Sequence, residues 1–157
     1  MTALWDAVCA RYARPGVKEL CLELQDAHGV DVPLLLVVAT LAARGRTLGD
    51  DHLDALAAAS APWQAVVVSP LRGVRRALRD GADAGAALGA EADTLRSLKA
   101  AVQAAELAAE RIQIDALERA AADWPADATL PPAEAVARVL ARWGAEVPAD
   151  RLRPLVD

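Results

Sequence analysis

The chain has 157 residues and a formal net charge of −5 at pH 7, and 55% of the residues are hydrophobic. A chain of this length buries about two-thirds of the surface that it exposes when unfolded, so it needs no disulfide or metal to fold. Its longest apolar run, residues 32–43, is shorter than the roughly 20 residues of a membrane helix, and no basic leader opens the chain, so we expect a cytoplasmic protein.

Apolar residues recur at steps of three and four through the first sixty positions, a spacing that predicts amphipathic helices. The predicted helices cover residues 2–13, 17–28, 32–44 and 50–60. Gly29 is placed to end the second helix as a C-cap, and the side chain of Asp31 is placed to begin the third as an N-cap.

Two prolines divide the segment that follows. Ser60 and Pro62 together predict the start of another helix, and Pro70 predicts a kink or restart with Ser69 as its cap. Residues 65–69, AVVVS, have strand propensity, but no partner strand is evident, so we expect them to be helical.

The second half of the chain is predicted to be helical after a break. Residues 80–90 contain three glycines and predict a linker between a bundle at 2–80 and the remainder at 91–157. A long helix follows near 91–124. Its apolar positions alternate steps of three and four, typical of a packed helix: Leu95, Leu98, Val102, Ala105, Ala109, Ile112 and Ala116. We therefore expect an all-α, single-domain bundle of about six to eight helices over 1–157.

Four arginines lie close together in the segment PLRGVRRALR, at i, i+3, i+4 and i+7 of one predicted helix. They are Arg72, Arg75, Arg76 and Arg79. Guanidinium groups bind oxyanions with two donors at a time, so this arginine row could bind a small anion, a nucleic-acid backbone or an acidic partner. An ion-paired or solvated face is the alternative, because the excess acidic residues all lie in the second half of the chain.

The long helix offers the arginines an internal counterpart. Its polar positions also recur at steps of three and four: Lys99, Gln103, Glu106, Glu110 and Gln113. Two carboxylates one turn apart can share a divalent metal, but such bundle sites place a histidine three residues on, where this chain has Gln113. We therefore expect no metal and no cofactor. We predict that at least one arginine of the row lies within salt-bridge distance of Glu106 or Glu110.

The histidines and cysteines have structural explanations. His28 with Asp26, and His52 with Asp51, would form a metal or acid–base site only if the two segments met in space. Asp51 is as readily a helix cap, and His28 suits the last turn of a helix. The two cysteines lie in apolar patterns that favour buried thiols over a disulfide.

Five segments carry a resemblance to a known family. In order they are LWDAVCARYARPGV, CLELQDAHGVDVPLLL, AARGRTL, APWQAVVVSPLRGVRRALR and AAELAAERIQIDALE. Over residues 4–118 they resemble a family of small proteobacterial proteins, domain of unknown function 2390. Pro33 departs from the family pattern, in which a polar residue, usually Asn, follows Asp-Val. The resemblance implies a cytosolic helical protein and transfers no catalytic residue. It adds Gln25 and Asp26 to the arginine row, Glu106 and Glu110 as candidates for a shared polar centre.

These observations favour a non-enzymatic interaction or regulatory protein. Its protein partner would contact the arginine row or the apolar positions of the long helix. The sequence leaves the oligomeric state open, with a homodimer among the options. One alternative is a small-molecule or anion-binding protein, including an enzyme, with the polar centre as its pocket. Another is nucleic-acid or ribosome binding through the arginine row, which the acidic net charge disfavours.

Overall fold

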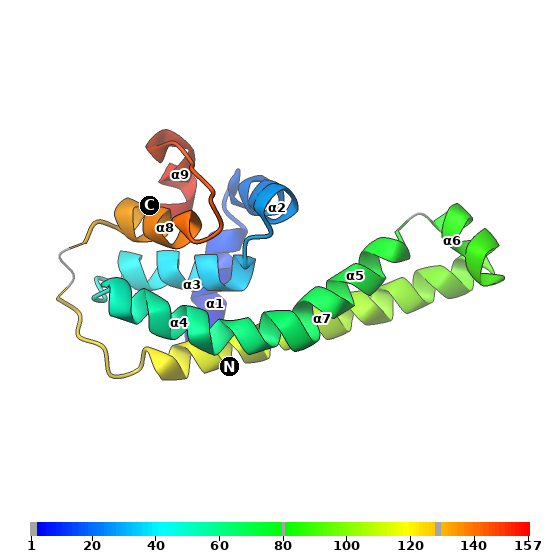
Figure 1. Ribbon diagram of the computed structural model, residues 1–157, viewed down its shortest axis with the longest axis horizontal. Coiled ribbons are helices and arrows are strands. Elements are labelled where there is room, and N and C mark those ends of the chain that lie inside the picture. The colour runs from blue at the N-terminus through cyan, green and yellow to red at the C-terminus, as the bar shows by residue number, and fades with distance from the viewer. Residues whose placement is uncertain (1–2, 80, 128–129) are drawn as a thin grey trace. The chain divides into compact units, whose positions relative to one another are not determined.

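The computed structural model of the protein describes residues 3–79, 81–127 and 130–157 (Figure 1). Helices and their connections make up these residues, and no β-strand is present among them. The helices are α1 (Ala3–Tyr12), α2 (Val17–His28), α3 (Val32–Ala43), α4 (Asp50–Trp63), the π-helical turn η1 (Gln64–Val68), α5 (Ser69–Ala77), α6 (Gly81–Leu88), α7 (Ala92–Ala120), α8 (Pro132–Ala141) and α9 (Ala149–Val156). The all-α fold with one long helix is confirmed.

The chain forms two compact units. Unit 1 comprises Met1–Ser60 and Ile114–Asp157, and unit 2 comprises Ala61–Gln113. Helices α4 and α7 each contribute residues to both units.

Unit 1 is organised around α3, which contacts α1, α8 and α9 (Figure 1). Residues 32–42 of this helix are all buried, as expected of a helix that is apolar on every side. The last turns of α7 join the same core through Ile114 and Leu117, which pack in one cluster with Leu4 and Leu56. The last turns of the long helix therefore belong to the core of unit 1.

The predicted caps at the end of α2 and at the start of α3 are both confirmed. Gly29 ends α2 in the left-handed conformation with φ 68°. Asp31 is the N-cap of α3, and its Oδ1 accepts a hydrogen bond from the backbone N–H of Leu34 at 3.1 Å.

The prediction of a helix start at Ser60 is wrong, because α4 continues through Trp63. The Ser60 hydroxyl is buried and donates to Asp31 Oδ2, so it does not serve as a cap.

Unit 2 contains a π-helical turn, η1, that Pro70 explains. The N–H of Ser69 donates to the carbonyl of Gln64, five residues back. Proline has no N–H, and its ring crowds the carbonyl four residues before it, so widening the preceding turn accommodates the ring. Residues 65–69 are thus helical as expected, but Ser69 is not a cap: its hydroxyl donates to Gln64 Oε1 at 3.4 Å.

The predicted linker at 80–90 is largely helical, because α6 occupies Gly81–Leu88. Alanine favours helix strongly enough to offset the glycines. Two glycines instead shape the turn that leads to α7. Gly89 takes φ 64°, and a Cβ at Gly85 would lie 3.0 Å from the carbonyl oxygen of Ala90.

Two helices end earlier than predicted. Helix α7 ends at Ala120, four residues before the expected limit, since Trp124 precedes Pro125 and a residue before proline disfavours the helical conformation. Helix α5 ends at Ala77, so Arg79 lies beyond it. The expected helical row of four arginines therefore contains three.

Candidate functional site

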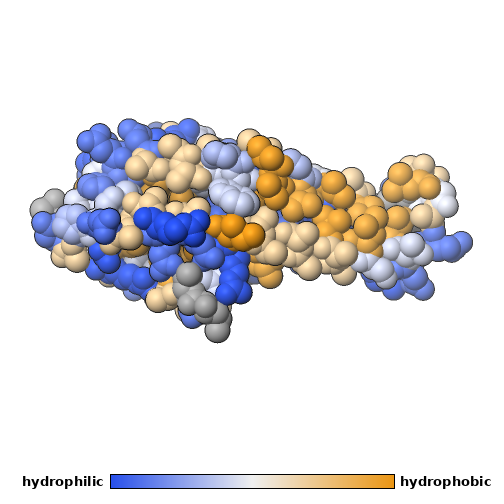
Figure 2. All heavy atoms as spheres, turned by 90° about the horizontal axis from the view of Figure 1, so that it is seen from below, coloured by the Kyte–Doolittle hydropathy of each residue, from blue (hydrophilic) through white to orange (hydrophobic). Residues whose placement is uncertain are grey.

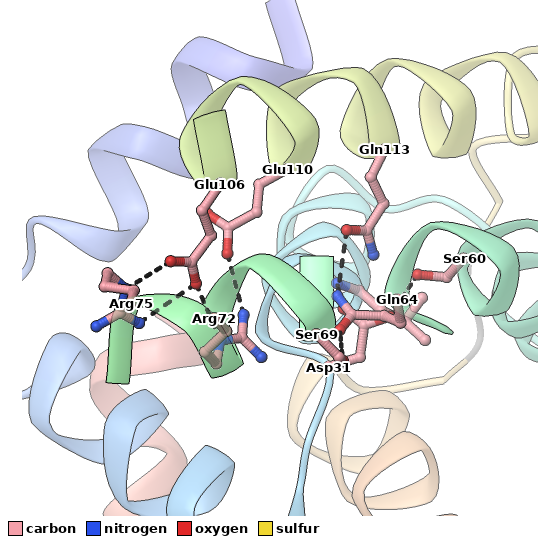
Figure 3. A network of polar contacts seen from close by, with 10 residues as sticks. Asp31, Ser60, Gln64, Ser69, Arg72, Arg75, Glu106, Glu110 and Gln113 are labelled. Carbon is pink, nitrogen blue, oxygen red and sulfur yellow. Dashed lines mark hydrogen bonds and ion pairs between the residues drawn. The ribbon is translucent and has the colours of Figure 1, made fainter. Parts of the chain in front are cut away.

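An ion-paired centre joins α5 to α7 within unit 2 (Figure 3). Arg72 Nε lies 3.0 Å from Glu106 Oε1, and Arg72 Nη2 lies 3.2 Å from Glu110 Oε1. Arg75 Nε lies 2.5 Å from Glu106 Oε2, and Arg75 Nη2 donates to Glu106 Oε1 at 3.3 Å. The prediction that an arginine of the row pairs with Glu106 or Glu110 is confirmed.

The centre is largely removed from water. Arg72 is 8% exposed and Glu106 is 6% exposed. Both carboxylate oxygens of Glu106 accept hydrogen bonds from guanidinium groups, as a buried charge requires. Because Glu106 and Glu110 neutralise Arg72 and Arg75, this part of the arginine row carries little net positive charge toward an outside anion.

A second polar contact continues along the same side of α7. Gln64 Nε2 of η1 donates to Gln113 Oε1 at 3.2 Å, and Gln113 is fully buried. The polar spacing of α7 included Gln113, but its partner Gln64 was not predicted. The available signal was an amide side chain beside the run of valines before Pro70.

The remaining candidates lie elsewhere or are more exposed. Arg76 and Arg79 are exposed residues of unit 2. Gln25 and Asp26 belong to α2 in unit 1, so the shared polar centre that the resemblance suggested draws on residues of both units and stays a prediction.

The histidines show no sign of a metal site. His52 packs its ring edge-on against Trp124, with centroids 4.5 Å apart, and its Nδ1 accepts from the N–H of Gly49 at 3.2 Å. Among the described residues, no three His, Cys, Asp or Glu side chains are grouped to hold a metal ion. The metal alternative for the two histidine segments, which the sequence left open, therefore has no support among the described residues.

The two cysteines differ in their exposure to solvent. Cys21 is buried, and burial raises the pKa of its thiol to about 12. Cys9 is exposed, so the expectation of two buried thiols is wrong for this residue. It lies on the face of α1 that turns away from the core residues Leu4 and Val8.

Sequence reasoning missed one buried charge in unit 1. Arg11 donates from Nε to the Thr40 hydroxyl at 3.2 Å and from Nη1 to the carbonyl of Leu155. Burial, and then the nearby charges of Arg14 and Arg44, lower the pKa of Arg11. The guanidinium ties α1 to α3 and to the last turn of α9, which is a structural role.

The apolar positions of α7 divide into two sets. Leu95 and Ala109 are buried, whereas Leu98 and Ile112 are 48% and 47% exposed. The prediction of one continuously packed apolar row is therefore wrong for three of its seven members, Leu98, Ala105 and Ile112. Together with two further exposed alanines they form a row at steps of three and four, which we call the outer seam: Leu98, Ala101, Ala105, Ala108 and Ile112.

Other large apolar side chains of unit 2 are also exposed, including Val66, Val74 and Leu107. Figure 2 shows hydrophobic residues over much of the surface of unit 2 on the face in view. Within the part of unit 2 that the structure describes, the buried residues are Val68, Leu78, Leu95 and Ala109 together with the polar Arg72, Glu106 and Gln113. Helix α7 thus turns the polar Glu106 and Gln113 toward α5 and η1, and several of its large apolar side chains are exposed.

Comparisons with known proteins identify a family and no activity. A family model described as "Protein of unknown function (DUF2390)" matches residues 3–117. The searches of curated proteins and of solved structures gave no match. No described helix has the length and apolar character needed to cross a membrane.

Proposed function

The chain belongs to the DUF2390 family of proteins of unknown function, and we propose that it is a non-enzymatic interaction protein whose partner binds the outer seam of α7. The observation that carries this proposal is the arrangement of unit 2, in which ion pairs and amides lie between the helices and several large apolar side chains, among them Leu98, Ile112 and Val66, are exposed.

Covering the outer seam would be favourable. Leu98 and Ile112 are each about half exposed, and full burial of such a side chain contributes about 1.5–3 kcal/mol relative to full exposure. Exposed apolar residues that gather on one surface typically mark an interaction site. Unit 2 has few buried hydrophobic residues, whereas unit 1 surrounds α3 with a continuous core. Burial of apolar surface against a partner would therefore stabilise unit 2 more than unit 1.

The ion-paired centre holds α5 on α7 and leaves the outer seam exposed. Arg72 and Arg75 link α5 to Glu106, which lies one residue after Ala105 of the outer seam. We assign these residues a positioning role: they hold α5 against the polar side of α7, and the outer seam stays uncovered. Their mutual neutralisation favours an apolar partner contact over the anion-binding and nucleic-acid alternatives.

Affinity capture with the tagged full chain tests the proposal. Leu98→Glu places a charge in the outer seam, and we expect capture of the specific partner to weaken about thirtyfold, because a lost interface anchor costs about 2 kcal/mol. Leu107→Glu is the matched control, since Leu107 is 55% exposed on the same helix but lies outside the outer seam. If the two variants and the wild type bind the same proteins equally, and self-association is also unaffected, the proposed function is wrong.

A further inference from the structure

We propose that a pocket in unit 1 binds a small free amino acid, with Arg44 and Arg46 for its carboxylate and Glu118 for its ammonium group. The pocket has a volume of about 200 Å³ and lies between the start of α1, the end of α3 and the end of α7. Its lining residues all belong to unit 1: Leu4, Leu41, Arg44, Arg46, Glu118, Ala121 and Ala122. This site is separate from the outer seam and does not depend on the proposed function.

The two arginines at the end of α3 keep donors for a ligand. Arg44 is the C-cap of α3, and Arg46 follows it after Gly45. Arg44 Nη2 donates to the carbonyl of Ala3 at 3.0 Å, and Arg46 Nη1 donates to the carbonyl of Trp124. Neither guanidinium forms an ion pair within residues 3–79, 81–127 and 130–157. Because a guanidinium has several N–H donors, each arginine can also bind an oxygen of a carboxylate in the pocket.

Glu118 brings one negative charge to the same pocket. Its Oε1 accepts from the backbone N–H of Leu4 at 3.3 Å, in the first turn of α1. Its Oε2 has no hydrogen-bond partner in the part of the chain that the structure describes. A carboxylate has lone pairs for several donors, so Glu118 can accept from an ammonium group without releasing Leu4.

This set of charges selects the class of ligand. A doubly charged anion such as inorganic phosphate would be repelled by Glu118, and a simple amine would be repelled by Arg44 and Arg46. A molecule with both a carboxylate and an ammonium group matches the two signs together. Positive charge also gathers around Arg44: burial, and then the charges of Arg14 and Arg44, lower the pKa of Arg11.

The volume and the apolar lining limit the side chain of the ligand. Leu4, Leu41 and Ala121 are buried and form the apolar floor, whereas Arg44 is exposed. A water molecule takes up about 30 Å³ in the liquid, so the pocket holds a ligand of about six to eight non-hydrogen atoms. Drug-sized ligands occupy larger sites, of about 300–1,000 Å³. An amino acid with a short apolar side chain, such as alanine or valine, is of the right size.

NMR titration of the full chain tests the inference, with L-alanine, β-alanine and L-valine as probes at up to about 20 mM. At least one should bind with a Kd of about 1 mM or lower. Arg44→Gln should weaken binding of the tightest probe about tenfold, because a charge-assisted hydrogen bond is lost. Arg119→Gln is the matched control, since it removes the same charge from an exposed residue of α7 that does not line the pocket. It should bind as the wild type does.

Propionate separates amino-acid binding from the binding of any small anion. It has the carboxylate and an apolar chain but no ammonium group, so the wild type should bind it about tenfold more weakly than the tightest amino acid. Glu118→Gln keeps an oxygen that can accept from Leu4 but loses the negative charge. This variant should therefore lose the preference for the amino acid. A purely structural role of Glu118 would weaken both ligands alike and leave the preference unchanged.

Three outcomes would overturn the inference. None of the three amino acids binds at 20 mM, propionate binds to the wild type as tightly as the best amino acid, or Glu118→Gln keeps the wild-type preference. Circular dichroism confirms that each variant keeps its helices, so a loss of binding reports on the pocket.

Discussion

Replacing Glu106 by alanine tests whether the ion-paired centre holds unit 2 together. The change removes the carboxylate that accepts from both Arg72 and Arg75. Arg72 then stays buried and keeps its ion pair with Glu110, at 3.2 Å. Removing one member of a buried pair costs about 3–5 kcal/mol, and because the Arg75 side chain is 26% exposed and can be hydrated, we expect about 2–3 kcal/mol.

Urea unfolding followed by circular dichroism measures this loss as a change in the free energy of unfolding. Asp93→Asn, on the same helix, is the matched control. It removes an ion pair to Arg96 whose side chains are 75% and 89% exposed, and such surface pairs contribute about 0–1 kcal/mol. The double variant Arg72→Met/Glu106→Leu should recover at least half of the loss, since apolar residues of similar size can replace a buried ion pair. A Glu106→Ala loss no larger than that of Asp93→Asn would refute a stabilising role for the centre.

Two further predictions concern unit 1. Asp31→Ala removes the N-cap of α3 and the acceptor of a buried hydroxyl, so the free energy of unfolding should fall by about 2–4 kcal/mol; a loss below 1 kcal/mol in urea titrations would show that neither bond matters. A thiol reagent at pH 8 should modify Cys9 in the native protein and Cys21 only after unfolding. Burial raises the pKa of Cys21 from 9.0 to about 12, so the thiol ionises at lower pH in the unfolded chain than in the folded one, and its contribution to the free energy of unfolding should decrease as pH rises from about 9 to 12. The test is the change in the free energy of unfolding from its value at pH 8. If this change is the same for the wild type and Cys21→Ala across that range, the prediction is wrong.

Local sequence signals determined most of the helices. The apolar spacing located α1, α2 and α3 closely, and the caps at Gly29 and Asp31 acted as predicted, because each depends on residues within one turn. The pairing of the arginine row with Glu106 was also within reach of the sequence. Helical spacing aligned charges of opposite sign on two helices, and buried charges require such partners.

Only the tertiary structure decided which side of α7 is covered. Periodicity shows that Leu98, Ala105 and Ile112 share a face, but it contains no information on which neighbour covers that face. Here α5 and η1 take the polar side, because Arg72 and Gln64 find Glu106 and Gln113 there. Tertiary structure also decided the role of Ser60. Its hydroxyl could cap a helix, but it donates a hydrogen bond to the carboxylate of Asp31, and α4 continues past it. A side chain that can satisfy two different partners has its choice made by long-range packing, and the residues around it in sequence do not encode that choice.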